Sequence, residues 1–319
     1  MPSSYFLALQ FTFSITTPVF LIVFLGLYLK QSKRINDEFI TIASKLIFNI
    51  CLPLLLFLAI VDSEVNLMTQ WKLASFSALA TLLSFIILWK AFSFFKVNSQ
   101  DKGVAVQSAF RSNLAIIGIA LCTKAFGEEG LSVGAIIIAV VTPLYNILSI
   151  YALTQSLNET KKLPWGKLLV DIVKNPLIIG IALAFVFLAL NWKLPIILND
   201  TANYLSGLTL PLALITIGGS LSLSDLRKSS RLSSYVVLAK LVLLPLCITV
   251  CAWFLGFRGV ELGCIALMFA CPTAAASFVM AKAIGGNHQL ASNTIAMSTL
   301  VSALTISLLL YLLRLIELA

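Results

Sequence analysis

Two short polar motifs lie within long apolar stretches of this sequence, where polar side chains are costly and rarely occur by accident. Arg111-Ser112-Asn113 lies near the centre of one stretch, and Cys271-Pro272-Thr273, followed by three alanines, lies at the centre of another. The cationic side chain of Arg111 and the amide of Asn113 can each bind a carboxylate. The residue types therefore indicate a buried site for a small anion.

Further polar residues fall on single faces of apolar segments and could line the same site. Asn49 precedes Pro53 by one turn, Asn146 shares a face with Thr142, and Ser298 and Ser302 share another. For the Ser and Thr hydroxyls, hydrogen bonding between helices is the favoured alternative. The candidate substrate-binding residues are Arg111, Ser112, Asn113, Pro272, Thr273, Asn49, Asn146, Ser298 and Ser302.

The sequence gives no sign of metal, cofactor or covalent chemistry. The six cysteines fall within apolar segments and include no pair with metal-binding spacing, so we expect neither a metal site nor a structural disulfide. His288, the single histidine, falls in a predicted loop and is assigned no role. Without a metal cluster or a buried pair of carboxylates, an enzyme is the least favoured class, and we expect no cofactor.

The elements that position these residues must lie in lipid. Of the 319 residues, 60% are hydrophobic and 11% are charged, whereas soluble domains are typically about 45–50% apolar and about 25% charged. A membrane-spanning helix needs roughly 20 mostly apolar residues. The sequence predicts an all-α polytopic membrane protein with ten such helices, at 5–29, 39–61, 73–94, 104–126, 131–155, 175–192, 201–222, 233–256, 259–284 and 290–316.

Basic residues alternate between successive predicted loops. The odd-numbered loops hold thirteen Lys and Arg residues, and the even-numbered loops hold four. Loops rich in these residues remain in the cytoplasm, so we expect both termini outside a bacterial inner (plasma) membrane. The net charge of +9 mostly reflects this topology, and we do not expect nucleic-acid binding. The oligomeric state is left open, with a homodimer as one option.

The two halves of the chain share weak motifs in the same order. LPL surrounds both Pro53 and Pro211, and a Gly-Val start and a Lys-Ala-x-Gly end recur in the fourth and ninth helices. This pairs a first repeat, 1–155, with a second repeat, 175–319, across a cytoplasmic or interfacial linker, 156–174. A unit of five spans must insert upside down the second time, and inverted repeats are typical of secondary transporters.

We expect the fourth and ninth helices to break and cross near the membrane midplane. Pro272 removes a backbone donor, and the alanines after it allow close approach of another helix. A simple proline kink and a buried polar pair are the alternatives. The N-termini of the half-helices would add positive partial charge beside Arg111, the deepest of four basic residues within the spans. The other three, which can extend towards a membrane surface, are Lys45, Lys240 and Lys282.

Several stretches together resemble the auxin efflux carrier family, in its compact bacterial branch that includes malate and malonate permease-like proteins. The resemblance runs nearly end to end through LPLLLF, AFRSNLAIIGIAL, PLYNILSIYAL, NPLIIGIAL, LPLALITIGGSL and CPTAAASFVMAKAIGGNHQLASNTIAMSTLVSALT. It implies ten helices in two inverted repeats, a scaffold bundle beside a moving bundle, and transport of organic anions. The matching crossing positions are Asn113, Pro272 and Thr273. The family proline that usually follows the helix 4 glycine is missing, because Ile119 and Ala120 follow Gly118.

The sequence thus predicts a secondary transporter of a small organic anion that works by alternating access. Arg111, Asn113 and the half-helix N-termini would hold a carboxylate, while Pro272 and Thr273 would shape the crossing. One alternative is a sodium-coupled organic-anion symporter of related fold. The other is a membrane receptor or sensor that binds its ligand without transporting it.

Overall fold

A computed structural model of the chain describes residues 4–62, 70–157, 166, 170, 173–221 and 230–316. These residues form helices and no β-strand. The elements are α1 (Ser4–Gln31), α2 (Asp37–Leu46), η1 (Ile47–Cys51), α3 (Leu52–Val61), α4 (Trp71–Phe94), α5 (Ser99–Phe110), η3 (Leu114–Gly118), α6 (Ile119–Leu157), α8 (Pro176–Ala189), α9 (Ile196–Gly207), α10 (Thr209–Ser220), α12 (Arg231–Leu238), η4 (Ala239–Leu243), α13 (Leu244–Phe254), α14 (Gly259–Ala270), α15 (Ala276–Ile284) and α16 (His288–Leu315), where η marks a π-helical turn.

Seven helices in the described part of the chain are long and apolar enough to cross a membrane. They are Tyr5–Gln31, Asp37–Val61, Trp71–Phe94, Leu114–Leu157, Ile196–Ser220, Arg231–Phe254 and His288–Leu315. Two shorter apolar helices, α8 and α14, accompany them. The prediction of an all-α, multi-pass membrane protein is confirmed at this level.

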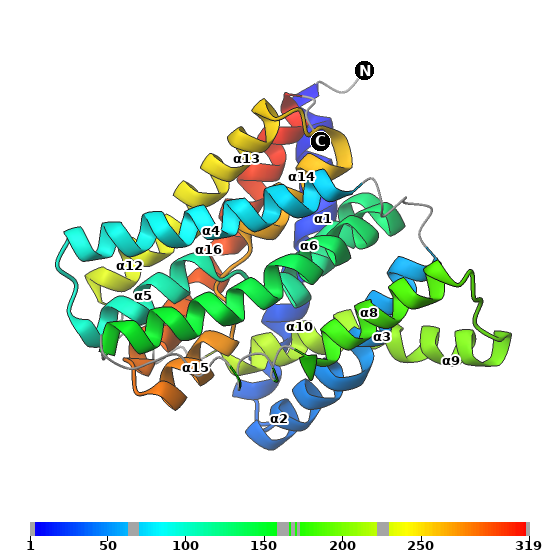
Figure 1. Ribbon diagram of the computed structural model, residues 1–319, viewed down its shortest axis with the longest axis horizontal. Helices are drawn as coiled ribbons and strands as arrows, with labels where there is room; N and C mark the ends of the chain where they lie inside the picture. Colours follow the sequence, from blue (N-terminus) through cyan, green and yellow to red (C-terminus); the bar gives the residue numbers. More distant parts are fainter. Residues whose placement is uncertain are drawn as a thin grey trace.

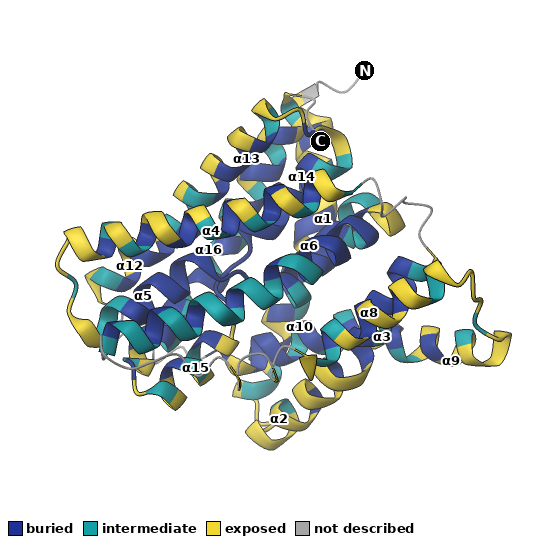
Figure 2. Cartoon of the chain, viewed as in Figure 1, coloured by how far each residue is buried: buried dark blue, intermediate teal, exposed yellow. Residues whose placement is uncertain are grey.

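The outer surface of the helices is apolar, as lipid requires. On α4, for example, Leu79, Leu83, Ile86 and Ile87 are all exposed, and Figure 2 shows exposed residues along the outer sides of α4, α13 and α2. The hydrocarbon core offers no water to backbone groups, so regular helices are the form that such a surface can take. The exposed apolar faces therefore mark the lipid-facing side.

Two prolines explain irregular turns within otherwise continuous helices. Pro53 follows the π-helical turn η1, and Pro245 follows η4. Proline has no N–H to donate to the preceding turn, and a π-helical turn is a common local adjustment at such a place. Both helices continue beyond the proline, so α2, η1 and α3 together make one long helix, and α12, η4 and α13 make another.

Several predicted boundaries are corrected. The predicted helix 201–222 begins earlier, at Ile196, and divides into α9 and α10 around Leu208. The predicted helix 175–192 ends at Ala189. The turn predicted between 126 and 131 is present at Gly127, whose φ of 61° and ψ of −142° are not helical and favour glycine. The chain reverses there, because a Cβ added at Gly130 would lie 2.3 Å from the Cys122 carbonyl oxygen, so α6 consists of two helices joined at Gly127. Most of the predicted linker 156–174 lies outside the described residues.

The helices form two groups that meet along α1, α10 and α6 (Figure 1). In one, α3 packs against α8 and α9; in the other, α4 packs against α5 and α6, and α14 packs against α6 and α13. Helix α1 packs closely on α10, where glycines face backbone on both sides: an added Cβ would lie 1.8 Å from the Val23 carbonyl oxygen at Gly218 and 2.2 Å from the Ile215 oxygen at Gly26. Small residues permit such close crossings in membranes.

Candidate functional site

The predicted interruptions of the fourth and ninth helices are present, and they pair with each other. Residues 111–113 separate α5 from η3, and residues 271–275 separate α14 from α15. Ser112 and Thr273 form an isolated antiparallel bridge. The Asn113 N–H donates to the Pro272 carbonyl at 2.8 Å, and the Ala274 N–H donates to the Arg111 carbonyl at 3.1 Å. The backbone groups freed by the two breaks therefore satisfy one another.

Local sequence explains why the chain leaves the helix at these points. The residue before a proline is pushed towards extended geometry, and Cys271 has φ −58° and ψ 148°. Arg111 is also extended, with φ −83° and ψ 103°. Side chains then complete the crossing: the Thr273 hydroxyl donates to the Ser108 carbonyl at 2.7 Å, and the Ser112 hydroxyl donates to the Phe269 carbonyl at 3.3 Å.

A cavity of 620 Å³ reaches this crossing, a size typical of small-molecule sites. Its walls come from α2, η1, α6, α8 and α10 on the sides and from both interruptions at the crossing. Five of the nine predicted site residues line it. These are Asn49, Arg111, Ser112, Asn113 and Asn146.

The cavity is basic and rich in amide groups. Arg111 and Lys45 line it together with Asn49, Asn113, Asn146 and Asn175, and its described lining includes no Asp or Glu. The first turn of α15, at Ala276, also lines it, and the first N–H groups of a helix have no partner within the helix. Such a lining favours an anion with several hydrogen-bond acceptors.

Arg111 is the central cation of this cavity, and neutral groups alone hold it. Its side chain is 8% exposed. One terminal nitrogen donates to the Asn146 side-chain oxygen at 2.9 Å; the other donates to the Tyr145 carbonyl at 3.3 Å and to the Ser149 hydroxyl at 3.2 Å. No carboxylate in the described part of the chain forms an ion pair with it. A buried charge without a counter-ion is costly, so an incoming anion would be strongly favoured.

Four predicted site residues are not among the residues that line the cavity. Pro272 and Thr273 form the crossing itself, and Thr273 is buried. The Ser298 hydroxyl accepts the Thr273 N–H at 3.1 Å, and the Ser302 hydroxyl donates to the Thr299 carbonyl at 2.8 Å. Neither serine is among the residues that line the cavity. Their observed role is hydrogen bonding within and between helices, which was the favoured alternative for Ser and Thr.

Lys240 belongs to the crossing, although its long side chain could also have extended towards a membrane surface. Its side chain is 1% exposed, and its ammonium group donates to the Ser112 hydroxyl and to the Phe269 carbonyl, the latter at 3.3 Å. Its place near the middle of an apolar segment was the one available signal. Asn175 was also missed; its side chain accepts the Leu177 N–H at 3.0 Å and caps α8 at the cavity wall.

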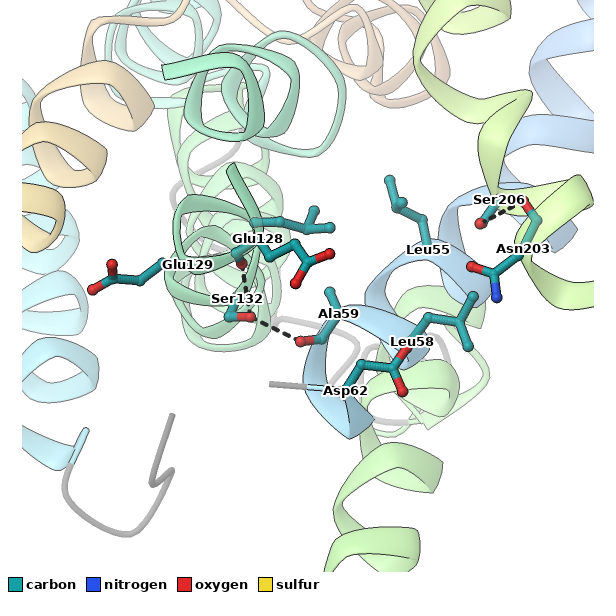
Figure 3. A pocket seen from close by; sticks show the side chains of 10 residues that line it. Leu55, Leu58, Ala59, Asp62, Glu128, Glu129, Ser132, Asn203 and Ser206 are labelled. Atoms are coloured by element: carbon teal, nitrogen blue, oxygen red, sulfur yellow. Dashed lines mark hydrogen bonds between the residues drawn. The ribbon is translucent and has the colours of Figure 1, made fainter. Parts of the chain in front are cut away.

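A second cavity, of 530 Å³, has the opposite charge. Asp62, Glu128 and Glu129 line it with Asn203 (Figure 3), and the Ser132 hydroxyl donates to the Ala59 carbonyl at 2.8 Å beside it. Loss of water around the carboxyl group, and secondly the nearby Glu128, raise the pKa of Asp62. The described lining contains no residue of either interruption. The two cavities meet opposite ends of the helix that runs from α2 to α3.

Comparison with known proteins agrees with this architecture. A family model described as "Membrane transport protein" matches residues 12–310. "Uncharacterized transporter YfdV" from Escherichia coli K12 is 22% identical over 307 residues, which cover 94% of this chain and 97% of that protein. An "Uncharacterized transporter" from Methanothermobacter thermautotrophicus is 24% identical over 91% of this chain and 94% of its own length.

A more similar but shorter match is a protein from Rhizobium meliloti named "Putative malonate transporter". It is 33% identical over 136 residues, which cover 42% of this chain and 41% of that protein. The family match extends over nearly the whole chain, and the multi-pass helical structure agrees with it. The chain is therefore a member of the membrane transport protein family, which is the auxin efflux carrier family that its sequence resembles.

Proposed function

We propose that this protein is a secondary transporter that moves a small organic anion, a carboxylate, across the membrane by alternating access. The observation that carries the proposal is Arg111, a cation held by neutral groups in a cavity whose described lining has no acidic residue. A carboxylate would supply the missing negative charge, with hydrogen bonds from Asn113, Asn49 and Asn146. Pro272 and Thr273 would shape the crossing, and Ser298 and Ser302 would support it through hydrogen bonds between and within helices.

The proposed topology has ten spans in two inverted repeats, 1–155 and 175–319, joined by the linker 156–174. Seven candidate spans support it, one of which, Leu114–Leu157, is divided at Gly127: its first part continues α5 as the proposed fourth span, and its second part is the proposed fifth. The shorter helix α8 and the interrupted pair α14–α15 would complete the ten. The reciprocal pairing of residues 111–113 with 271–275 also supports a two-fold relation between the halves. Both termini would lie outside a bacterial inner membrane, according to the distribution of Lys and Arg.

Two cavities at opposite ends of one helix support an alternating-access cycle. The cavity that reaches the crossing begins near Ser44 and Lys45, on the side that the basic loops predict to be cytoplasmic. We therefore propose that this structure is the inward-facing state. The acidic cavity near Asp62 would be the vestibule on the other side, separated from the crossing in this state.

The test is counterflow in proteoliposomes with labelled malonate and malate, the former chosen because of the name of the Rhizobium protein. We expect uptake that needs only unlabelled substrate inside, and we expect Arg111→Gln to abolish it. Arg258→Gln is the matched control, because Arg258 belongs to the turn before α14 and does not line the cavity. Equal uptake by the wild type and Arg111→Gln would contradict the assignment of the site.

The same assay separates the alternatives. Dependence of uptake on a sodium gradient would favour the sodium-coupled symporter. Saturable binding of a carboxylate without counterflow in vesicles would favour the receptor or sensor. The described lining of the cavity at the crossing contains no acidic residue, so a cation would find no charged ligand there. This supports transport that is not coupled to a sodium gradient.

A further inference from the structure

Lys240 is a buried cation that has no role in the transport mechanism proposed above. It lies in the π-helical turn η4, away from the described lining of the cavity, and its side chain is among the largest that are fully buried. Its ammonium group contacts the Ser112 hydroxyl and the Phe269 carbonyl. No carboxylate among the described residues forms an ion pair with it. Its partners are thus neutral oxygens on both interrupted helices.

The position of Phe269 explains why a cation is stable there. Helix α14 ends at Ala270, so the Phe269 carbonyl is one of the last four of the helix and has no partner within it. The aligned peptide dipoles place negative partial charge at this end. The Ser112 hydroxyl also points at this carbonyl, so one ammonium group connects the end of α14 to the interruption after α5.

Free carbonyls at the C-terminal end of a broken helix are also what binds the coupling ion in many secondary transporters. Here the side chain of Lys240 occupies that end of α14. A fixed ammonium group provides the positive charge and the hydrogen bonds that a bound sodium ion would otherwise provide. It also stays with the protein throughout a transport cycle, so its positive charge does not come from an ion that moves down its gradient.

We propose that Lys240 is the built-in cation of the crossing, which makes transport independent of sodium, and that shortening its side chain leaves a site for a small external cation. The inference rests on the proposed transport function. It assigns Lys240 the role of a positioning residue: it holds Ser112 and the end of α14 and does not touch the substrate. The ligand class of the vacated site is a monovalent cation of the size of ammonium, methylammonium or sodium.

The first test measures counterflow by the wild type in sodium and in choline, and by Lys240→Ala, Lys240→Met and Lys240→Arg with choline as the sole external cation. We expect the wild-type rate to be the same in sodium and in choline. We expect both neutral variants to lose about tenfold or more in rate, because a buried polar network loses its charged member, and Lys240→Arg to retain more activity than either. Wild-type rates in Lys240→Met, or an absolute requirement of the wild type for sodium, would overturn the proposal.

Rescue by added cations distinguishes charge from packing. Adding ammonium, methylammonium or sodium should restore transport by Lys240→Ala in a saturable way and should not restore Lys240→Met, whose side chain still fills the space. Lys90→Ala, which removes an exposed lysine from α4, is the control and should respond to no cation. A folded Lys240→Ala protein that no cation restores would overturn the proposal.

Thermal unfolding in detergent gives a readout that does not need transport. Ammonium or methylammonium should raise the melting temperature of Lys240→Ala relative to choline, and should leave the wild type and Lys90→Ala unchanged. If the wild type fails to transport any carboxylate but this shift is present, the proposed function fails and the cation role of Lys240 stands. An equal shift in all three proteins would contradict the cation role.

Discussion

Ser112 and Thr273 each direct a hydroxyl to the carbonyl that lies four residues before the other. The Ser112 hydroxyl donates to Phe269, and the Thr273 hydroxyl donates to Ser108. If either helix continued through its break, its own backbone N–H would donate a hydrogen bond to that carbonyl. Each hydroxyl therefore replaces the hydrogen bond that the opposite helix loses at its break. Each interrupted helix is thus capped by a hydroxyl group from the other, and the stability of the crossing depends on both hydroxyls.

Replacing the Thr273 hydroxyl with a methyl group should weaken the crossing. Thr273→Val keeps the shape of the side chain but leaves the buried Ser108 carbonyl without this donor, which should cost about 1–3 kcal/mol of the free energy of unfolding. Thermal unfolding in detergent measures the loss. Thr273→Ser, which keeps the hydroxyl, is the matched control. If Thr273→Val and Thr273→Ser unfold at the same temperature, the hydroxyl does not hold the crossing.

A methyl group at Gly218 should separate α1 from α10. The added Cβ would lie 1.8 Å from the Val23 carbonyl oxygen, and neither backbone can yield without moving a whole helix. Gly218→Ala should therefore lower the melting temperature strongly, with a cost in the range of overpacked cores, about 1–3 kcal/mol or more. Gly207→Ala is the control, since an added Cβ at Gly207 meets nothing within 4 Å. Equal melting temperatures would show that this contact is not tight.

The acidic cavity predicts a pH dependence of stability that comes from Asp62. Its pKa is raised by the loss of water around the carboxyl group and then by Glu128, so the folded protein holds this proton more tightly than the unfolded chain does. The contribution of Asp62 to stability therefore falls as pH rises from the ordinary aspartate pKa through the raised one. Melting temperatures measured across this range should fall less in Asp62→Asn than in the wild type.

The control for this pH series is Asp200→Asn, which removes an exposed carboxylate from α9 and should leave the wild-type profile unchanged. Glu128→Gln should also flatten the profile, but by less than Asp62→Asn, because Glu128 is the second cause of the pKa shift and loss of water the first. A wild-type slope that persists in Asp62→Asn would assign the dependence to other groups.

Much of the site could be predicted from the sequence, because polar groups are rare in apolar segments. Arg111, Asn113, Asn49 and Asn146 were all identified in this way and all line one cavity. The interruptions were predictable for a related reason: Pro272 cannot continue a helix, and Arg111-Ser112-Asn113 needs polar partners. These signals are local, and a single sequence is sufficient to read them.

The rest depended on which neighbour each face meets. Ser298 and Ser302 share a helical face as predicted, but that face meets the back of the crossing and not the cavity. Lys240 has a side chain long enough to reach a membrane surface, and its length does not reveal that it points inward. Periodicity gives the direction of a side chain around its own helix, whereas the partner on the next helix follows only from packing.

Asn146 offers a sharp test of the anion site because its side-chain oxygen accepts a hydrogen bond from Arg111 at 2.9 Å. Asn146→Asp places a carboxylate at this position with almost no change in size. The new charge would pair with Arg111 and occupy the cation that the substrate needs, so counterflow of labelled malonate should fall by about tenfold or more, through weaker apparent affinity. Asn146→Ser, which removes the amide without adding charge, should lose much less. Wild-type affinity in Asn146→Asp would mean that the substrate does not use the charge of Arg111.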